Sequence, residues 1–288
     1  MASRFQTDKL GYKAILDHIQ AAIPEHMFQL NTTVLNINYS DIGVTLKTSR
    51  DHKHKRYDYV IVTSSLGHLK KYHQKLFTPP LPRKKIEAIE KIGFGGASKI
   101  FFRWKQPWWS NKTYSIMPLP VKGMARNTID KFDRALNTLQ ILDWEPNTTI
   151  AWIGGESNKS IEPPVEIIRS RLTKDDLLLG SYSYLSVAQA KAQIPHSRLA
   201  IPVKQNKRLK VLFAGEATHH RLFQTAIGSY LSGRREADRL NLDWESRNPV
   251  RMAARFAKSM RNHSKPACKN SRLPVDILPT YEVVKCYP

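Results

Sequence analysis

Cysteine is scarce in this sequence. The 288 residues include two cysteines, Cys268 and Cys286, and both lie near the C-terminus. Two isolated cysteines cannot build the disulfide framework of a small secreted domain or a four-ligand zinc site. His219 and His220 are adjacent, but no third ligand stands at metal spacing, so we interpret them as a polar turn pair. The sequence therefore predicts a protein of a reducing compartment that binds no metal.

Long apolar runs are also missing. No stretch approaches the roughly 20 apolar residues that cross a bilayer, and residues 1–6 contain no apolar signal core. We therefore expect no membrane partner and place the protein in the cytoplasm. The C-terminus, Lys285–Pro288, is not the Ser-Lys-Leu peroxisomal signal, although a peroxisomal or nuclear location stays open.

Acidic residues are few relative to basic ones. The sequence has 46 Lys and Arg against 24 Asp and Glu, a formal net charge of +22. Such an excess attracts nucleic acid and repels free cations. The basic residues are spread along the chain and no recognised nucleic-acid-binding motif accompanies them, so we interpret them as solvated surface. A non-catalytic protein that binds nucleic acid or acidic partners is kept as the alternative.

The sequence has 13 glycines but no Gly-x-Gly-x-x-Gly loop. That loop lets backbone amides approach a dinucleotide pyrophosphate at the start of a doubly wound sheet. The nearest approach, residues 93–96, precedes a predicted strand and does not open a helix. Residues 93–96 are therefore not expected to bind a pyrophosphate as a Gly-x-Gly-x-x-Gly loop does.

The most informative segment present is the one between residues 211 and 240. The apolar run Val211–Ala214 predicts a strand, residues 215–218 a turn, and the apolar spacing from Ile227 to Leu240 a helix. A helix start presents unpaired N–H groups, and Glu216 lies where it can accept hydroxyls of a ribose-like ligand. The segment predicts a site for a polyhydroxylated cofactor with an electron-rich ring.

Residues 212–219, Leu-Phe-Ala-Gly-Glu-Ala-Thr-His, are followed by Thr-x-x-Gly and Leu-Ser-Gly-x-x-Glu-Ala. This pattern resembles the C-terminal flavin-binding signature of the polyamine oxidases, the spermine oxidase branch of the flavin monoamine oxidase superfamily. The resemblance implies that Glu216 hydrogen-bonds the ribityl chain of FAD and that the backbone at Thr225, Ala226 and Ile227 faces the flavin ring. Ile227 stands where the family usually has His, so a polar group beside the ring is missing.

Three other segments resemble the same family in the same order. Residues 59–82 resemble a strand that leads into a Leu-Gly-x-Leu-Lys turn and a Phe-x-Pro-x-Leu-Pro helix entry. Residues 92–102 resemble the strand that carries the active-site lysine, which implies this role for Lys99. The Gly-Ser-Tyr-Ser segment at residues 180–183 implies that Tyr182 walls a substrate tunnel.

The resemblance also implies that the backbone of Val34, which begins a predicted strand, contacts the adenine. The three side chains assigned above also have structural explanations. Lys99 could instead be an exposed lysine on a strand edge, Tyr182 a core aromatic, and Glu216 a residue that caps a turn.

The resemblance implies an α/β fold, in which a partial FAD-binding domain of the amine oxidase type carries an inserted α+β substrate domain. In the family, the strand at residues 151–156 feeds a long helix, but here Pro163 follows almost directly, so a helix is expected to be missing after residue 156. The expected domains are residues 1–77 (FAD-binding), 78–209 (substrate), 210–245 (return to FAD-binding) and 246–288 (basic tail).

The function that the resemblance implies is oxidation of spermine, spermidine or acetylated polyamines by FAD and oxygen, with release of hydrogen peroxide. In this chemistry Lys99 would hold a water or relay a proton beside the ring. Half of the FAD cradle is absent from this sequence, which resembles the C-terminal portion of the family. We therefore expect a truncated chain with doubtful FAD retention and little or no activity.

Overall fold

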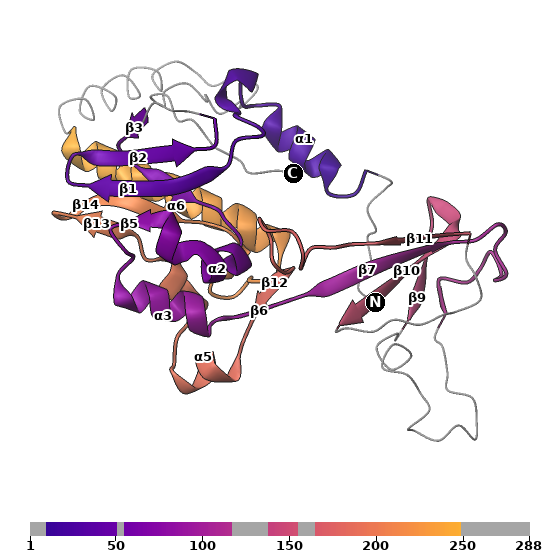
Figure 1. Ribbon diagram of the computed structural model, residues 1–288. Helices are drawn as coiled ribbons and strands as arrows, with labels where there is room; N and C mark the ends of the chain where they lie inside the picture. Colours follow the sequence, from indigo (N-terminus) through magenta and orange to yellow (C-terminus); the bar gives the residue numbers. More distant parts are fainter. Residues whose placement is uncertain (1–9, 51–54, 117–137, 155–164, 249–288) are drawn as a thin grey trace, which may run out of the picture. The chain divides into compact units, whose positions relative to one another are not determined.

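The computed structural model describes residues 10–50, 55–116, 138–154 and 165–248 (Figure 1). The chain divides into two compact units. The first comprises Met1–Pro24 and Phe94–Tyr182, and the second comprises Glu25–Gly93 and Ser183–Pro288.

The second unit contains a four-stranded sheet in the order β3-β2-β1-β5. β1 and β2 form an antiparallel hairpin, and β5 joins β1 in parallel through Ile37 and Phe77. Alternate residues of β1 are buried, as a sheet with one covered face requires. The strands are β1 (Val34–Ser40), β2 (Gly43–Thr48), β3 (Lys55–Tyr57) and β5 (Phe77–Thr78).

A three-stranded sheet of the same unit has the order β13-β14-β4. β14 pairs with β4 in parallel, and β13 pairs with β14 as an antiparallel hairpin. The apolar run predicted as a strand is the buried end of β14, where Val211, Leu212 and Phe213 are at most 2% exposed. The strands are β4 (Val60–Val62), β13 (Val203–Gln205) and β14 (Arg208–Phe213).

Helices of the second unit pack around these sheets. Ser65 caps the first long helix by accepting the N–H of His68 at 3.0 Å, and Pro82 precedes the next helix, where its fixed φ favours a helix start. A helix follows Pro82, as the helix entry within residues 59–82 indicated. The elements are η1 (Glu25–Met27), α2 (Leu66–Leu76), α3 (Arg83–Lys91), α5 (Val187–Lys191), η2 (His196–Ala200), η3 (Glu216–Thr218) and α6 (Ala226–Arg247).

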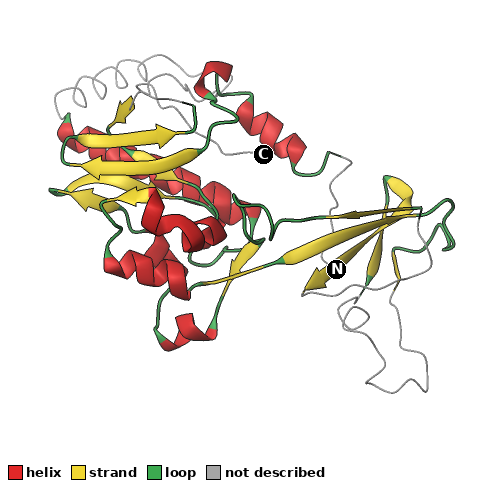
Figure 2. Cartoon of the chain, in the orientation of Figure 1, coloured by secondary structure: helices red, strands yellow, loops and turns green. Residues whose placement is uncertain are grey.

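The first unit is built on a five-stranded sheet in the order β11-β7-β10-β9-β8. β7 lies between β10 and β11 and is antiparallel to both, as the strands drawn in yellow in Figure 2 show. Ile100, Phe102 and Trp104 pack with Leu139 and Ala151 as its core. The elements are α1 (Lys13–Gln20), β7 (Ala97–Arg103), β8 (Ser115–Ile116), β9 (Leu139–Leu142), β10 (Glu145–Gly154) and β11 (Glu166–Arg169).

Two short strands, β6 (Gly93–Gly95) and β12 (Tyr182–Tyr184), pair with each other. Residues 155–164, where a missing helix is expected, and residues 249–288 of the basic tail lie outside the described residues. Within the described ranges, none of the helices has the length and apolar character needed to cross a bilayer.

Candidate functional site

A strand, a tight turn and a helix start form the predicted corner in the second unit. β14 ends at Phe213, and Gly215 turns the chain at a φ of +120°, a conformation that residues with side chains rarely adopt. The N–H of Gly215 donates to Ser232 Oγ of α6 at 2.8 Å. The chain then runs through η3, and α6 begins at Ala226. The predicted order of strand, turn and helix is confirmed.

Glu216 is the polar centre of this corner. Its Oε1 accepts the N–H of Ser183 at 3.0 Å, and its Oε2 accepts the Ser183 hydroxyl at 2.8 Å and the N–H of Gln224 at 2.7 Å. A carboxylate offers about four lone-pair sites, and the described residues fill three of them and leave one, on Oε1, open. Glu216 therefore holds the turn and can still accept one hydroxyl of a ligand.

The start of α6 presents two open donors. Thr225 caps the helix: its Oγ1 accepts the N–H of Gly228 at 2.9 Å and donates to the carbonyl of Leu222 at 2.7 Å. Among the described residues no acceptor contacts the N–H of Ala226 or Ile227. Both residues are exposed, and their N–H groups point along the helix axis, so the corner can receive an electron-rich group there.

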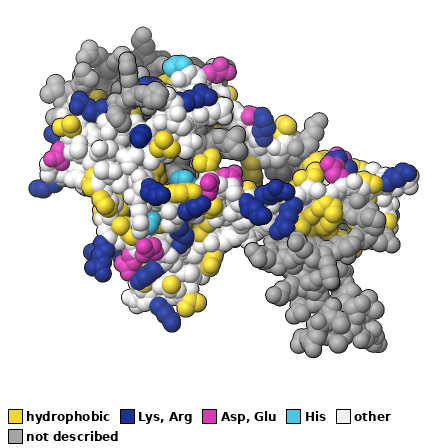
Figure 3. All heavy atoms as spheres, in the orientation of Figure 1, with side chains coloured by type: hydrophobic (Ala, Val, Ile, Leu, Met, Phe, Trp, Pro, Cys, Tyr) yellow, Lys and Arg dark blue, Asp and Glu magenta, His cyan; other side chains and the backbone are white. Residues whose placement is uncertain are grey.

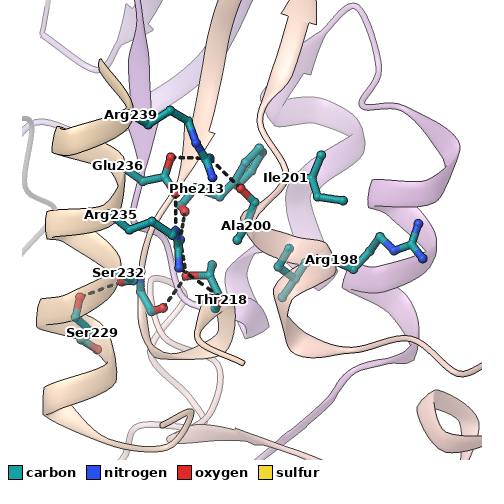
Figure 4. A network of polar contacts seen from close by, with 12 residues as sticks. Arg198, Ala200, Ile201, Phe213, Thr218, Ser229, Ser232, Arg235, Glu236 and Arg239 are labelled. Carbon is teal, nitrogen blue, oxygen red and sulfur yellow. Dashed lines mark hydrogen bonds and ion pairs between the residues drawn. The ribbon is translucent and has the colours of Figure 1, made fainter. Parts of the chain in front are cut away.

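A buried ion-pair network anchors α6 behind the corner (Figure 4). The Glu236 side chain is 0% exposed and accepts Arg235 Nε at 2.6 Å and Arg239 Nη1 at 2.7 Å. Arg235 also donates to the carbonyl of Phe213 at 2.9 Å and to the hydroxyl of Thr218 at 3.0 Å. The network thus ties the helix to the end of β14 and to η3, the element that carries Glu216.

The same network reaches η2. Arg239 Nη1 donates to the carbonyl of Ala200 at 2.9 Å, and Lys85 Nζ of α3 donates to the carbonyls of Leu199, at 2.6 Å, and Ile201. The Lys85 ammonium also lies 4.0 Å from the centre of the Phe213 ring. Two basic side chains therefore hold the carbonyls at the C-terminal end of η2.

Burial lowers the pKa of Lys85 to about 7, and the nearby Glu236 carboxylate opposes that shift. The sequence interpretation missed this residue because it assigned residues 83–85 to the solvated basic surface. The spacing of residues in the sequence did indicate that Lys85 is buried. Lys85 lies three and four positions before Ala88 and Ile89, on the apolar face of the helix, where a lysine needs buried partners.

Val34 lies at an open edge of β1. The carbonyl of the preceding residue, Thr33, accepts the N–H of Ser49 at 2.8 Å, so the backbone groups of Val34 are directed toward the opposite edge. β5 joins that edge only from Ile37 onward. The geometry is compatible with the expected adenine contact, which stays a prediction.

Lys99 and Tyr182 belong to the first unit. Lys99 lies on β7 opposite Trp152, and its side chain is exposed. β7 is paired on both sides, so Lys99 is not on a strand edge as its structural explanation supposed. Tyr182 is 39% exposed, more than a core aromatic would be. Their expected roles as active-site lysine and tunnel wall stay predictions.

His219 and His220 form a turn pair, as predicted. Their rings stack with centres 5.1 Å apart, and His219 Nδ1 accepts the N–H of Leu222 at 2.9 Å. Burial, and then the neighbouring His220, lower the pKa of His219. Across the described ranges no group of His, Cys, Asp and Glu could hold a metal ion.

Figure 3 shows one face of the described residues, with basic side chains at many places on it. Lys and Arg, in dark blue, are scattered over that face with Asp and Glu among them. The interpretation of the charge as solvated surface stays a prediction.

Comparison with known proteins identifies relatives. The sequence profile described as "Flavin containing amine oxidoreductase" matches residues 3–241. "Probable polyamine oxidase 5" of Arabidopsis thaliana is 30% identical over 80% of this chain and 54% of its own length. "Peroxisomal N(1)-acetyl-spermine/spermidine oxidase" of Bos taurus is 30% identical over 82% of this chain and 54% of its own. The chain spans about half the length of these curated relatives.

A solved structure of putrescine oxidase bound to putrescine matches with a TM-score of 0.60 at 15% identity, and covers 81% of this chain and 53% of that one. At this identity the match concerns the fold alone, and it confirms the predicted α/β fold class. The family implies FAD as cofactor, as the sequence resemblance did. With a profile that matches most of its length, this chain belongs to the flavin-containing amine oxidoreductase family.

Proposed function

We propose that this chain provides the C-terminal portion of a flavin-dependent oxidase of polyamines, which oxidises spermine, spermidine or their acetylated forms and releases hydrogen peroxide. The family assignment and the relatives named as polyamine oxidases support the proposal. The observation that carries it is the corner at Glu216, where one open acceptor site and two open N–H donors lie within one strand-turn-helix unit.

The residues of the corner fit the flavin end of FAD. Glu216 Oε1 would accept a ribityl hydroxyl, and the N–H groups of Ala226 and Ile227 would donate to a carbonyl edge of the ring. The open edge of β1 at Val34 would receive the adenine. When bound, FAD supplies the two-electron acceptor and the place where oxygen is reduced to hydrogen peroxide.

The remaining roles rest on motif positions. We assign Lys99 to hold a water or relay a proton, because a polyamine must lose a proton from its reacting amine before it can give up hydride. Tyr182 would face the alkylammonium chain with its ring. Ile227 offers no polar side chain to the flavin, so its backbone alone contributes there.

We further propose that the chain by itself retains FAD weakly and turns over little substrate. Its sequence contains no Gly-x-Gly-x-x-Gly loop, so the pyrophosphate would lack its usual amide donors. Each contact that remains is worth on the order of 1–3 kcal/mol. A cytoplasmic location is proposed from the scarcity of cysteine, while the bovine relative is named as peroxisomal.

The test compares the 288-residue chain with a fusion protein in which the N-terminal portion of the bovine relative precedes it. Each is dialysed against FAD, bound flavin is measured by absorbance, and peroxide release is measured with spermine and with N1-acetylspermine. We expect a flavin band in the fusion and little in the chain alone. Strong flavin retention by the chain alone would overturn the expected impairment.

Two matched variants of the fusion test the corner itself. Glu216→Gln should lower flavin uptake, whereas Glu87→Gln, on the exposed face of α3, should leave it unchanged. Equal uptake by both variants would show that Glu216 is a turn residue without a role in cofactor binding. A flavin-loaded fusion that releases no peroxide from either polyamine would refute the proposed substrate class.

A further inference from the structure

The loop that leads into α6 has a narrowly defined conformation. This loop, residues 219–225, is called the α6 entry loop. Gln224 has a φ of +69°, in the left-handed region that residues with side chains seldom adopt. The carbonyl of Leu222 lies so close to Gly228 that a Cβ there would be 1.9 Å from the oxygen. The loop must therefore be held firmly if the N–H of Gln224 is to reach Glu216.

An aromatic contact holds the α6 entry loop from outside the corner. The ring of Phe223 stacks on the ring of His196, the first residue of η2, with centres 4.0 Å apart and planes 11° apart. His196 is 2% exposed, so this face of the loop is packed against a buried group. The stack is the aromatic contact that joins the loop to the body of the second unit.

Hydrogen bonds fix the orientation of the His196 ring. Gln189 Nε2 lies 2.9 Å from the carbonyl of Ile194 and 3.1 Å from His196 Nδ1. Because the carbonyl can only accept, the amide nitrogen donates to both, which assigns the imidazole proton to Nε2. Burial lowers the pKa of His196 to about 4, so the ring is neutral at physiological pH.

The element that carries His196 is itself immobilised. Lys85 and Arg239 hold the carbonyls at the C-terminal end of η2, as described above. His196 therefore presents a fixed ring surface to Phe223. Because Phe223 packs on this fixed ring, the neighbouring residues of the α6 entry loop are restricted as well.

We propose that His196 is a positioning residue for the flavin-facing corner: by stacking on Phe223 it fixes the α6 entry loop, and with it the Gln224 N–H on Glu216 and the start of α6. This inference rests on the proposed function for the ligand that the corner receives. The effect on the loop is a property of the chain without ligand and can be measured there.

The experiment is amide hydrogen exchange of the full-length chain, read by mass spectrometry on peptides that cover residues 219–225. His196→Asn keeps a hydrogen-bonding side chain and removes the stacking ring, and we expect exchange in the loop to become about 2- to 10-fold faster, the range that a ring pair supports. His196→Phe restores a ring and should return the loop to within about twofold of the parent.

A second buried histidine supplies the control. His73 on α2 is 5% exposed and, like His196, has a buried Nε2 that meets no hydrogen-bond partner among the described residues. His73→Asn should leave exchange in the α6 entry loop unchanged. If His196→Asn fails to fold, Phe223→Leu removes the other ring from a half-buried position and should give the same acceleration.

Unchanged exchange of the loop in His196→Asn or Phe223→Leu, equal acceleration in His73→Asn, or no rescue by His196→Phe would overturn the proposal. Failure of the proposed function gives a different pattern. In that event the loop still responds to His196 as expected, while flavin uptake by the fusion protein does not respond to Glu216→Gln.

Discussion

Replacing Lys85 with Met removes a buried amine and keeps the apolar stem. In the parent chain, burial shifts the pKa of this amine from 10.5 to about 7, which corresponds to a penalty of roughly 5 kcal/mol on the charged form in the folded state. The variant loses the donors to the carbonyls of Leu199 and Ile201, each worth about 1–3 kcal/mol when a buried acceptor is orphaned. Below pH 7 these two effects nearly offset, so we expect the parent and Lys85→Met to have similar free energies of unfolding.

The pH dependence of the free energy of unfolding distinguishes the parent from Lys85→Met. Below pH 7 the folded and unfolded states both bind the proton, and Lys85 contributes no slope. Between pH 7 and pH 10.5 the unfolded chain keeps the proton and the folded chain loses it. The unfolded state then binds more protons, so the free energy of unfolding rises with pH, by about 1 kcal/mol per pH unit from this residue. The neutral amine still has two N–H donors for its two close carbonyls.

Urea unfolding followed by circular dichroism at pH 6, 7, 8 and 9 measures this difference. The parent should gain about 2–3 kcal/mol over Lys85→Met between pH 7 and pH 9. Lys84→Met, at an exposed position of the same helix, should follow the parent at every pH. Parallel profiles for the parent and Lys85→Met would mean that Glu236 keeps the amine charged, and the argument from burial would be refuted.

Glu236→Gln removes the buried carboxylate that pairs with two half-buried guanidiniums, and it should cost about 3–5 kcal/mol of stability by thermal unfolding. Asp238→Asn on the exposed face of α6 should cost little, and equal effects would contradict the network. Gly228→Ala places a Cβ against a carbonyl oxygen and should destabilise the chain by about 1–3 kcal/mol. The Cβ of Gly233→Ala meets no described atom within 4 Å, so this variant should stabilise the helix by up to about 1 kcal/mol. Both effects are measured from urea midpoints, and the same sign for both would refute the steric argument. In a flavin-loaded fusion, Lys99→Met should keep the flavin and slow polyamine-dependent peroxide release by about 10²–10⁴-fold, and turnover at the parent rate would leave Lys99 as scaffold.

Local signals made the corner predictable from the sequence. The apolar run before Gly215, the small-residue turn and the helical spacing from Ile227 to Leu240 each correspond to a local backbone preference, and all three agree with the structure. The same holds for the helix after Pro82. Such features are set by a few neighbouring residues, so a single sequence is enough to find them.

The contacts that hold the corner could not be found in this way. The carbonyl partners of Lys85 lie more than a hundred residues later in the chain. The stack of His196 on Phe223 joins η2 to the α6 entry loop, and no sequence motif links these two segments. Glu216 was expected to bind a ligand or cap a turn, and the geometry leaves room for both. Burial and partner choice depend on tertiary packing, which propensity and spacing do not encode.

The chain leaves the second unit after Gly93 and re-enters it at Ser183. Gly93 lies against the ring of Tyr184, so closely that a Cβ on residue 93 would be 2.5 Å from a ring carbon. The polypeptide between them is therefore an insertion whose two ends meet. Closing such a loop costs only about 0.6 kcal/mol more for each doubling of its length. The inserted part can therefore be lengthened or shortened with little effect on the stability of the scaffold that carries Glu216.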